Sequence, residues 1–247
     1  MKRILPILLV LFVTLCAFAA PKARKSKPDL DQIRKEVSDP QSQYYYPKLM
    51  QRYEQNETVM TLDDYRRLYF GYMFEEDFNP YRHTPHSHKV EELYYKSHHN
   101  KGECDSIIKY AGLVLQDNPF DLQQIDYMVY ALQQKKKNNL ARIWLYRLNH
   151  LIEAIVSTGT GHDKENAWYV INPQHEYFVL NRLGRVVNDF QFEEPGYDHI
   201  KVNAKGKENA DYYFYSLPFL TEYRLKYPEE DDTVEVPDDE EEVEVVE

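Results

Sequence analysis

The polar residues best suited to chemistry are concentrated between Gly159 and Glu176. His162, His175 and Glu176 supply two imidazoles and a carboxyl group, the kinds of side chain that transfer protons in hydrolases. His175-Glu176 would open the HExxH motif of zinc proteases, but Val179 occupies the position of its second histidine. The stretch is therefore a candidate hydrolase or small-ligand site without a defined catalytic set.

A second cluster, His83, His86 and His88, has the spacing HxxHxH. Three imidazoles this close together could share a metal ion. However, no helical i, i+4 pair and no neighbouring cage of cysteine or acidic residues fixes their geometry. We therefore predict an exposed histidine-rich loop, with no metal site and no cofactor.

The segment Ser157–Gly161 reads Ser-Thr-Gly-Thr-Gly and could cradle a phosphate, because glycines let backbone amides turn toward an anion. A P-loop needs a Gly-Lys pair on a strand-to-helix turn, whereas these glycines follow a predicted helix and no such pair is present. A helix C-terminus presents carbonyl groups, which repel phosphate. A glycine cap and turn is the better interpretation.

The chain contains 22 tyrosines. Exposed tyrosines suit recognition surfaces because they combine apolar area with a polar tip, although we expect most of these to fill a helical core. The remainder could line a groove for a protein or a carbohydrate. The candidate ligand- or partner-binding residues are Tyr65, Arg66, Tyr69, His162, His175, Glu176 and Tyr177.

The N-terminus has the order of a secretory signal peptide. Lys2 and Arg3 precede an apolar run to Phe18, with small residues before a cleavage point after Ala19. The run is shorter than the roughly 20 residues that span a bilayer. The sequence thus predicts export to the periplasm or the extracellular space, with no transmembrane span after cleavage. Lipid anchoring through Cys16 is the alternative, which the bulky leucine before it disfavours.

Charge is segregated along the chain. The formal net charge is −11, but residues 229–247 hold twelve acidic side chains and no basic one. Without this tail and the signal peptide the body is nearly neutral, which argues against the basic face that nucleic-acid binding usually requires. We expect self-repulsion to keep the acidic tail disordered.

Apolar stripes with helical spacing predict antiparallel helices over residues 105–116, 121–132 and 140–156. Asp121 can cap the second of these helices. The run Tyr110–Pro119 resembles the second helix and closing turn of a tetratricopeptide-like repeat, in which small residues let paired helices approach closely. These helices should therefore stack as hairpins.

Two further signals flank this stack. Thr61 and Asp64 resemble a capping box that opens an earlier helix. After Gly184 the pattern changes, and β-forming residues at 197–202 and 212–217 enclose a polar, glycine-bearing segment typical of a hairpin.

We therefore predict a mostly α fold of stacked, tetratricopeptide-like helical hairpins with a small C-terminal β-hairpin. The expected organisation is a signal peptide at 1–19, a flexible leader with a short helix at 20–43, a single mostly helical domain at 44–228 and a disordered acidic tail at 229–247.

An ordered string of motifs resembles the uncharacterised family called domain of unknown function 4919. The resemblance covers roughly residues 44–217, and it implies an exported protein of Gram-negative bacteria. No activity or catalytic residue comes with it. The motifs are Tyr46–Tyr53, Leu62–Gly71, Asn79–Tyr81, Gly159–Gly161, Ala167–Ile171 and Glu176–Leu180.

Together these observations favour a non-catalytic module of the bacterial cell envelope that binds a protein or peptide in a groove between helices. The expected partner is an envelope or secreted protein. The alternative is an exported hydrolase or small-ligand-binding protein with its site near Gly159–Glu176.

Overall fold

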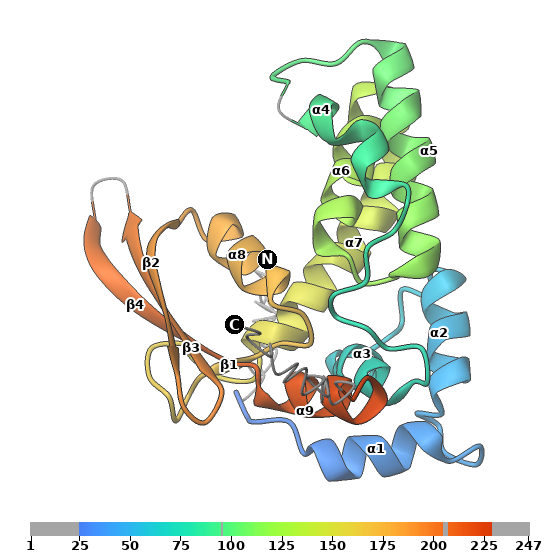
Figure 1. Cartoon of the computed structure of the whole chain (residues 1–247). Coiled ribbons are helices and arrows are strands. Elements are labelled where there is room, and N and C mark those ends of the chain that lie inside the picture. The colour runs from blue at the N-terminus through green and yellow to red at the C-terminus, as the bar shows by residue number, and fades with distance from the viewer. Residues whose placement is uncertain (1–24, 95, 205–206, 229–247) are drawn as a thin grey trace, which may run out of the picture.

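A computed structural model describes residues 25–94, 96–204 and 207–228 (Figure 1). The predicted signal peptide and acidic tail lie outside these residues. Most of the described chain is helical, and none of the helices in it is long and apolar enough to cross a membrane. The α-helices are α1 (Leu30–Ser38), α2 (Tyr46–Glu54), α3 (Leu62–Gly71), α4 (Glu91–Tyr94), α5 (Lys101–Asp117), α6 (Leu122–Gln134), α7 (Asn138–Val156), α8 (Gln174–Arg182) and α9 (Leu217–Lys226), and the 3-10 helices are η1 (Tyr72–Phe74) and η2 (Ser87–Val90).

Local capping sets the start of two helices as predicted. At α3 the Asp64 amide donates to Thr61 Oγ1 over 3.2 Å, and the Thr61 amide donates to Asp64 Oδ2 over 2.8 Å. At α6 the carboxylate of Asp121 accepts a 3.0 Å hydrogen bond from the Gln124 amide. Both caps satisfy amide groups that a helix leaves without internal partners.

The helices form two packed groups. In Figure 1, α5, α6 and α7 lie side by side as a tall arm, and α1, α2 and α3 lie at its base. Leu68 and Tyr69 of α3 and Leu148 of α7 are fully buried where the two groups meet. Ile33 and Val37 of α1 are also buried in this core, so residues before position 44 contribute to its packing.

The first and last described helices lie next to each other. Arg34 of α1 forms an ion pair with Glu222 of α9. The Lys226 ammonium at the end of α9 donates to the Met73 carbonyl over 2.8 Å, which fastens α9 to η1. The two ends of the described fold are therefore joined at the base of the molecule (Figure 1).

One sheet stands beside the helical arm (Figure 1). It contains β1 (Trp168–Tyr169), β2 (Val186–Glu193), β3 (Tyr197–Ala204) and β4 (Lys207–Tyr215) in the order β1-β4-β3-β2. β1 runs parallel to β4 and the other neighbours are antiparallel, with Ile200 of β3 opposite Phe190 of β2 and Tyr212 of β4. Ile200 and Phe214 are fully buried, so one face of the sheet belongs to the core.

The predicted fold class, stacked helical hairpins with a small C-terminal β-hairpin, was wrong. A hairpin is present as β3 and β4, but it belongs to a four-stranded mixed sheet. The signals for the other strands are weak for a physical reason. β2 is an edge strand whose side chains are largely exposed, so it has no buried apolar alternation, and β1 is only two residues long.

The Gly-Thr-Gly segment forms a tight turn after α7. The Gly161 amide donates to the Asn166 carbonyl over 2.8 Å, and Trp168 Nε1 donates to the Gly159 carbonyl over 3.0 Å. A Cβ atom at Gly159 would lie 2.1 Å from the Asn166 carbonyl oxygen. Glycine is required here because the two backbone segments touch.

We expect Gly159→Ala to lower the free energy of unfolding by about 2 kcal/mol or more, because the backbone must move to admit the methyl group. Gly112→Ala is the matched control. Its new Cβ in α5 would meet Met128 Cε at an ordinary 3.7 Å, so a gain of about 0.5–1 kcal/mol is expected from helix propensity. Urea denaturation of both variants measures the free energy of unfolding. Equal changes in the two variants would contradict the close approach of Gly159 to the Asn166 carbonyl.

Candidate functional site

A buried hydrogen bond connects two of the predicted site residues. Tyr69 of α3 and His175 of α8 approach to 2.7 Å between the hydroxyl and Nδ1, and both side chains are buried. The Ile171 amide donates to the Tyr69 hydroxyl over 3.3 Å, and the ring of His175 forms a hydrogen bond to the Phe120 backbone that favours its protonated form.

This arrangement holds His175 as a neutral imidazole. Burial lowers its pKa to about 3, against a smaller opposing effect of the Phe120 backbone hydrogen bond. Burial also raises the pKa of Tyr69. The bond to Tyr69 and the interaction with the Phe120 backbone therefore place His175 to hold α3, α8 and the turn before α6 together.

Glu176 forms a buried carboxyl pair with Asp198 of β3. The two residues are 1% and 6% exposed. Burial raises the pKa of Glu176 well above its usual range, and the charge of Asp198 and a side-chain hydrogen bond to it raise it further. Glu176 therefore stays protonated and donates to Asp198, which joins α8 to the inner face of the sheet. Its Oε1 atom has no hydrogen-bond partner within the described residues.

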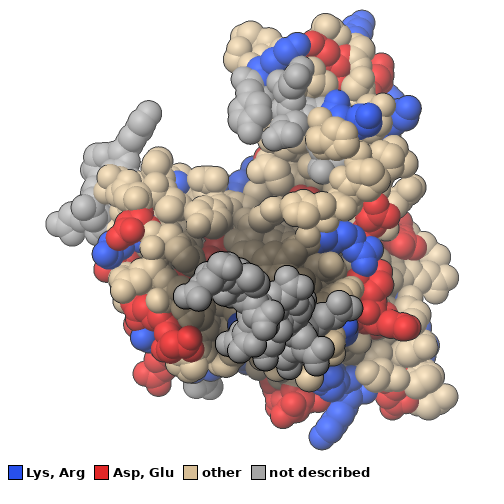
Figure 2. Space-filling model, viewed as in Figure 1, with Lys and Arg blue, Asp and Glu red and all other residues tan. Residues whose placement is uncertain are grey.

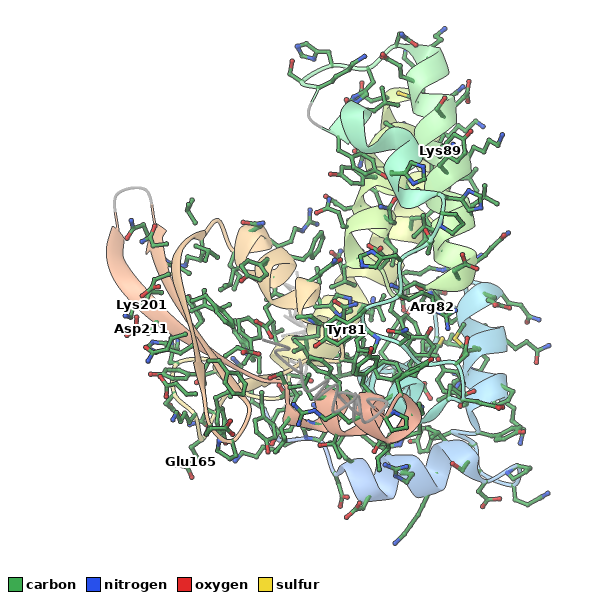
Figure 3. The ribbon with its side chains drawn as sticks, viewed as in Figure 1. Tyr81, Arg82, Lys89, Glu165, Lys201 and Asp211 are labelled. Carbon is green, nitrogen blue, oxygen red and sulfur yellow. The ribbon has the colours of Figure 1, made fainter. Side chains whose placement is uncertain are left out.

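Tyr81 lies close to this carboxyl pair. Figure 3 shows it between the sheet and the helical arm, and its ring packs against Tyr223 of α9 with 5.0 Å between centroids. Its pKa is raised by burial first, then by Tyr223, Asp198 and Glu176 among others. Tyr81 therefore lies within electrostatic range of the carboxyl pair.

Arg66 connects two segments of the fold through hydrogen bonds. Its Nη1 atom donates to Ser157 Oγ over 2.6 Å and its Nη2 atom donates to the Ser26 carbonyl over 2.9 Å. The Ser26 amide in turn donates to the Ser157 carbonyl over 3.0 Å. Arg66 thus fixes the segment before α1 to the end of α7.

His162 and Tyr65 lie apart from His175. His162 is exposed in the loop between α7 and β1, with its ring 5.1 Å from that of Tyr212. Glu165 of the same loop lies at the lower left of Figure 3, at the bottom of the sheet. Tyr65 is buried between α3 and α7, where its ring stacks on His150 at 4.9 Å. The structure does not bring these candidates together in one site.

A pocket of about 320 Å³ lies between α8 and the start of α6. It includes His175 and Tyr177 of the predicted site residues. Figure 2 shows mainly uncharged residues on the uncovered surface between the sheet and the helical arm. The pocket is lined by Asn118, Asp121, Leu122, Gln123, Asn172, Gln174, His175, Tyr177, Phe178 and Asn181.

Carboxamide side chains dominate this pocket, and sequence reasoning missed them. Asn118, Gln123, Gln174 and Asn181 make no side-chain hydrogen bond with any described residue. Asn172 differs, because its Nδ2 atom donates to the Pro80 carbonyl over 2.9 Å. The four free carboxamides offer both donors and acceptors to a bound molecule.

A periodic signal for this lining was present in the sequence. Gln174, Tyr177, Phe178 and Asn181 follow the i, i+3, i+4, i+7 spacing of one helix face. α8 presents this face to the pocket beside the buried ring of His175, whereas Glu176 is buried against Asp198 of the sheet. The mixture of amide and aromatic groups hides the face from a search for apolar stripes.

The edges of the pocket are held by polar contacts. Arg182 of α8 and Asp126 of α6 form an ion pair at 3.3 Å, which bridges the two helices. Burial raises the pKa of Asp121, while backbone hydrogen bonds from Gln124 and Gln123 oppose the rise. The pocket is lined largely by uncharged polar and apolar side chains, with Asp121 as its acidic residue.

The histidine-rich segment shows no metal cage within the described residues, where no three His, Cys, Asp or Glu side chains are grouped to hold an ion. His83 and His88 are exposed, and the ring of His86 lies 6.3 Å from that of Tyr110.

These features define a mostly helical protein with a mixed four-stranded sheet and a polar pocket between two helices. The chain belongs to the family described as Domain of unknown function (DUF4919), whose model matches residues 31–224. The family resemblance seen in the sequence motifs is thereby confirmed. Comparison with curated proteins gave no match, and comparison with solved structures gave none either.

We expect Tyr69→Phe to destabilise the protein by about 1–3 kcal/mol, because His175 Nδ1 and the Ile171 amide lose a buried partner. Tyr227→Phe is the control, since Tyr227 is 39% exposed and its change should stay within about 0.5 kcal/mol. Denaturation at pH 7 compares the two. Equal stability losses would show that the hydroxyl of Tyr69 is not needed.

Glu176→Gln should become increasingly stabilising, relative to the wild type, as pH rises above 4.5. Folded Glu176 keeps a proton that the unfolded chain releases, because its folded pKa is raised. Glu176 therefore stabilises the wild type fully at a pH below its pKa in the unfolded chain. This stabilisation is lost as the pH rises toward the pKa of Glu176 in the folded protein. The carboxamide of the variant donates without titrating. Denaturation at pH 5 and pH 8 tests this, with the exposed Glu153→Gln as control, and parallel pH profiles for wild type and Glu176→Gln would contradict it.

Proposed function

We propose that this protein is a non-catalytic peptide-binding module whose site is the pocket between α6 and α8. The observation that carries the proposal is the set of four carboxamides, Asn118, Gln123, Gln174 and Asn181, that line the pocket without hydrogen bonds to other described residues. Unpaired amide groups on an accessible wall gain most from a ligand that supplies both donors and acceptors.

A peptide segment matches this lining. Each peptide unit carries one donor and one acceptor, as each carboxamide does. Leu122 and Phe178 are buried at the pocket and provide an apolar base for one side chain. Tyr177, 41% exposed, adds an amphipathic surface at the opening. The small amount of exposed charge favours an uncharged segment of the partner.

Binding is better supported than catalysis because the titratable groups nearby are already used. His175 is bonded to Tyr69 through Nδ1 and burial lowers its pKa to about 3, and Glu176 is buried against Asp198. His162 lies in a different loop and does not line this pocket. A hydrolase near Gly159–Glu176 would need these three groups around one cavity.

The proposal includes export of the protein to the cell envelope or beyond. Its support is the signal-like order of residues 1–19, with the basic pair before the apolar run. The partner would then be an envelope or secreted protein with an uncharged, extended segment.

We expect the double variant Gln123→Ala/Asn181→Ala to weaken peptide binding by about tenfold, because each lost hydrogen bond contributes about 0.5–1.5 kcal/mol. The probe is a fluorescein-labelled set of end-capped decapeptides built from Asn, Ser, Thr, Gly and Tyr. Fluorescence polarisation measures the affinity. Gln133→Ala on the exposed surface of α6, outside the pocket, should leave it unchanged.

Two outcomes would count against this function. Equal peptide affinities for the double variant and Gln133→Ala would show that the peptide does not bind in this pocket. Binding of uncharged oligosaccharides, with none of the peptides, would assign the carboxamides to a carbohydrate instead.

A further inference from the structure

A second pocket, of about 300 Å³, lies between α7, α3 and the loop after α2. Its lining shares no residue with the carboxamide pocket. The volume is at the lower end of the range of about 300–1,000 Å³ that is usual for small-molecule sites. The lining residues are Asn56, Glu57, Thr58, Tyr65, Asn139, Arg142, Ile143, Tyr146 and Arg147.

One wall of this pocket is aromatic and held in place. The rings of Tyr65 and Tyr146 are 6.4 Å apart at 66°, and both pack on His150. The Tyr146 hydroxyl donates to the Thr58 carbonyl over 2.9 Å, which fastens the loop after α2 to α7. Together with Ile143, these rings give a preformed apolar surface.

The polar part of the pocket carries an excess of positive charge. Arg142 and Arg147 both line it, and neither forms an ion pair with a described acidic residue. The acidic residue in the lining is Glu57, which is already paired with Arg52 at 2.8 Å. An anion entering the pocket would therefore meet two arginines and no free carboxylate of the lining.

Arg147 is buried but incompletely paired. It is 8% exposed, and its guanidinium lies 4.6 Å from the rings of both Tyr53 and Trp144. Nη2 donates to the carbonyls of Tyr53 and Glu54 over 2.8 and 3.0 Å, while Nε has no partner within the described residues. A buried charge opposed only by neutral dipoles favours a nearby anion.

We propose that this pocket binds a small amphipathic carboxylate. The carboxylate accepts hydrogen bonds from the exposed Arg142, and the buried charge of Arg147 attracts it from behind. The apolar body of the ligand packs against Tyr65, Ile143 and Tyr146. A planar carboxylate suits the guanidinium fork, and a single charge on an apolar body suits a pocket with one aromatic wall.

Isothermal titration with three isosteric probes tests the charge requirement. 4-Phenylbutyrate should bind at least about tenfold more tightly than 4-phenylbutanol, and 4-phenylbutylamine should not bind. 3-Phenylpropyl phosphate serves as the fourth probe. Tighter binding of the phosphate than of the carboxylate would overturn the assignment of ligand class, and equal binding of acid and alcohol would overturn the role of the arginines.

Two variants place the binding event in this pocket. Arg142→Gln should reduce the affinity for 4-phenylbutyrate toward that of the alcohol, whereas Arg224→Gln, which removes the same charge from an exposed position on α9, should not alter it. Ile143→Trp should fill the pocket and abolish binding of both probes while the protein stays folded by circular dichroism. Unchanged affinity in Arg142→Gln or in folded Ile143→Trp would overturn the site.

Discussion

The chain of buried hydrogen bonds through Tyr69 and His175 is the constraint on which the carboxamide pocket depends. It connects α3 in the helical core, α8 beside the sheet and the Phe120 backbone in the turn before α6. These three parts are far apart in the sequence, and no disulfide joins them within the described residues. Because the polar atoms are buried, each must keep its partner, so the relative position of α8 and α6 is fixed to within hydrogen-bond tolerance.

α8 is unusual in the distribution of its side chains. Its buried positions include the polar residues His175 and Glu176, while its pocket face combines carboxamide and aromatic groups. The buried pair acts as two connectors, one to α3 and one to Asp198 of the sheet. The helix thus gains a specific orientation from polar contacts, which apolar packing alone would define less sharply.

The sequence allowed the elements to be predicted where local chemistry decides the structure. Thr61 and Asp121 mark helix starts because capping involves neighbours only, and the β3–β4 hairpin follows from its turn-forming residues. β1 was missed because it is two residues long and its partner β4 is remote in the sequence, and β2 was missed because its side chains are largely exposed and show no buried apolar alternation. Tyr69 and His175 were both singled out, but their contact spans 106 positions, and no local pattern encodes a distance of that kind. The carboxamides of α8 were missed because they share their helix face with aromatic groups, so the face does not form an apolar stripe.

The ion pair between Arg34 and Glu222 has a consequence for biosynthesis. α1 is the first described element to be made and α9 is the last, so the partner of Arg34 is synthesised only after all the other described elements. Ile33 and Val37 of α1 can pack against α3 earlier. Arg34, on the outer side of α1, has no Glu222 to pair with until α9 has been made. The fold therefore closes late, and a chain interrupted before α9 would leave the base of the molecule open to chaperones and proteases.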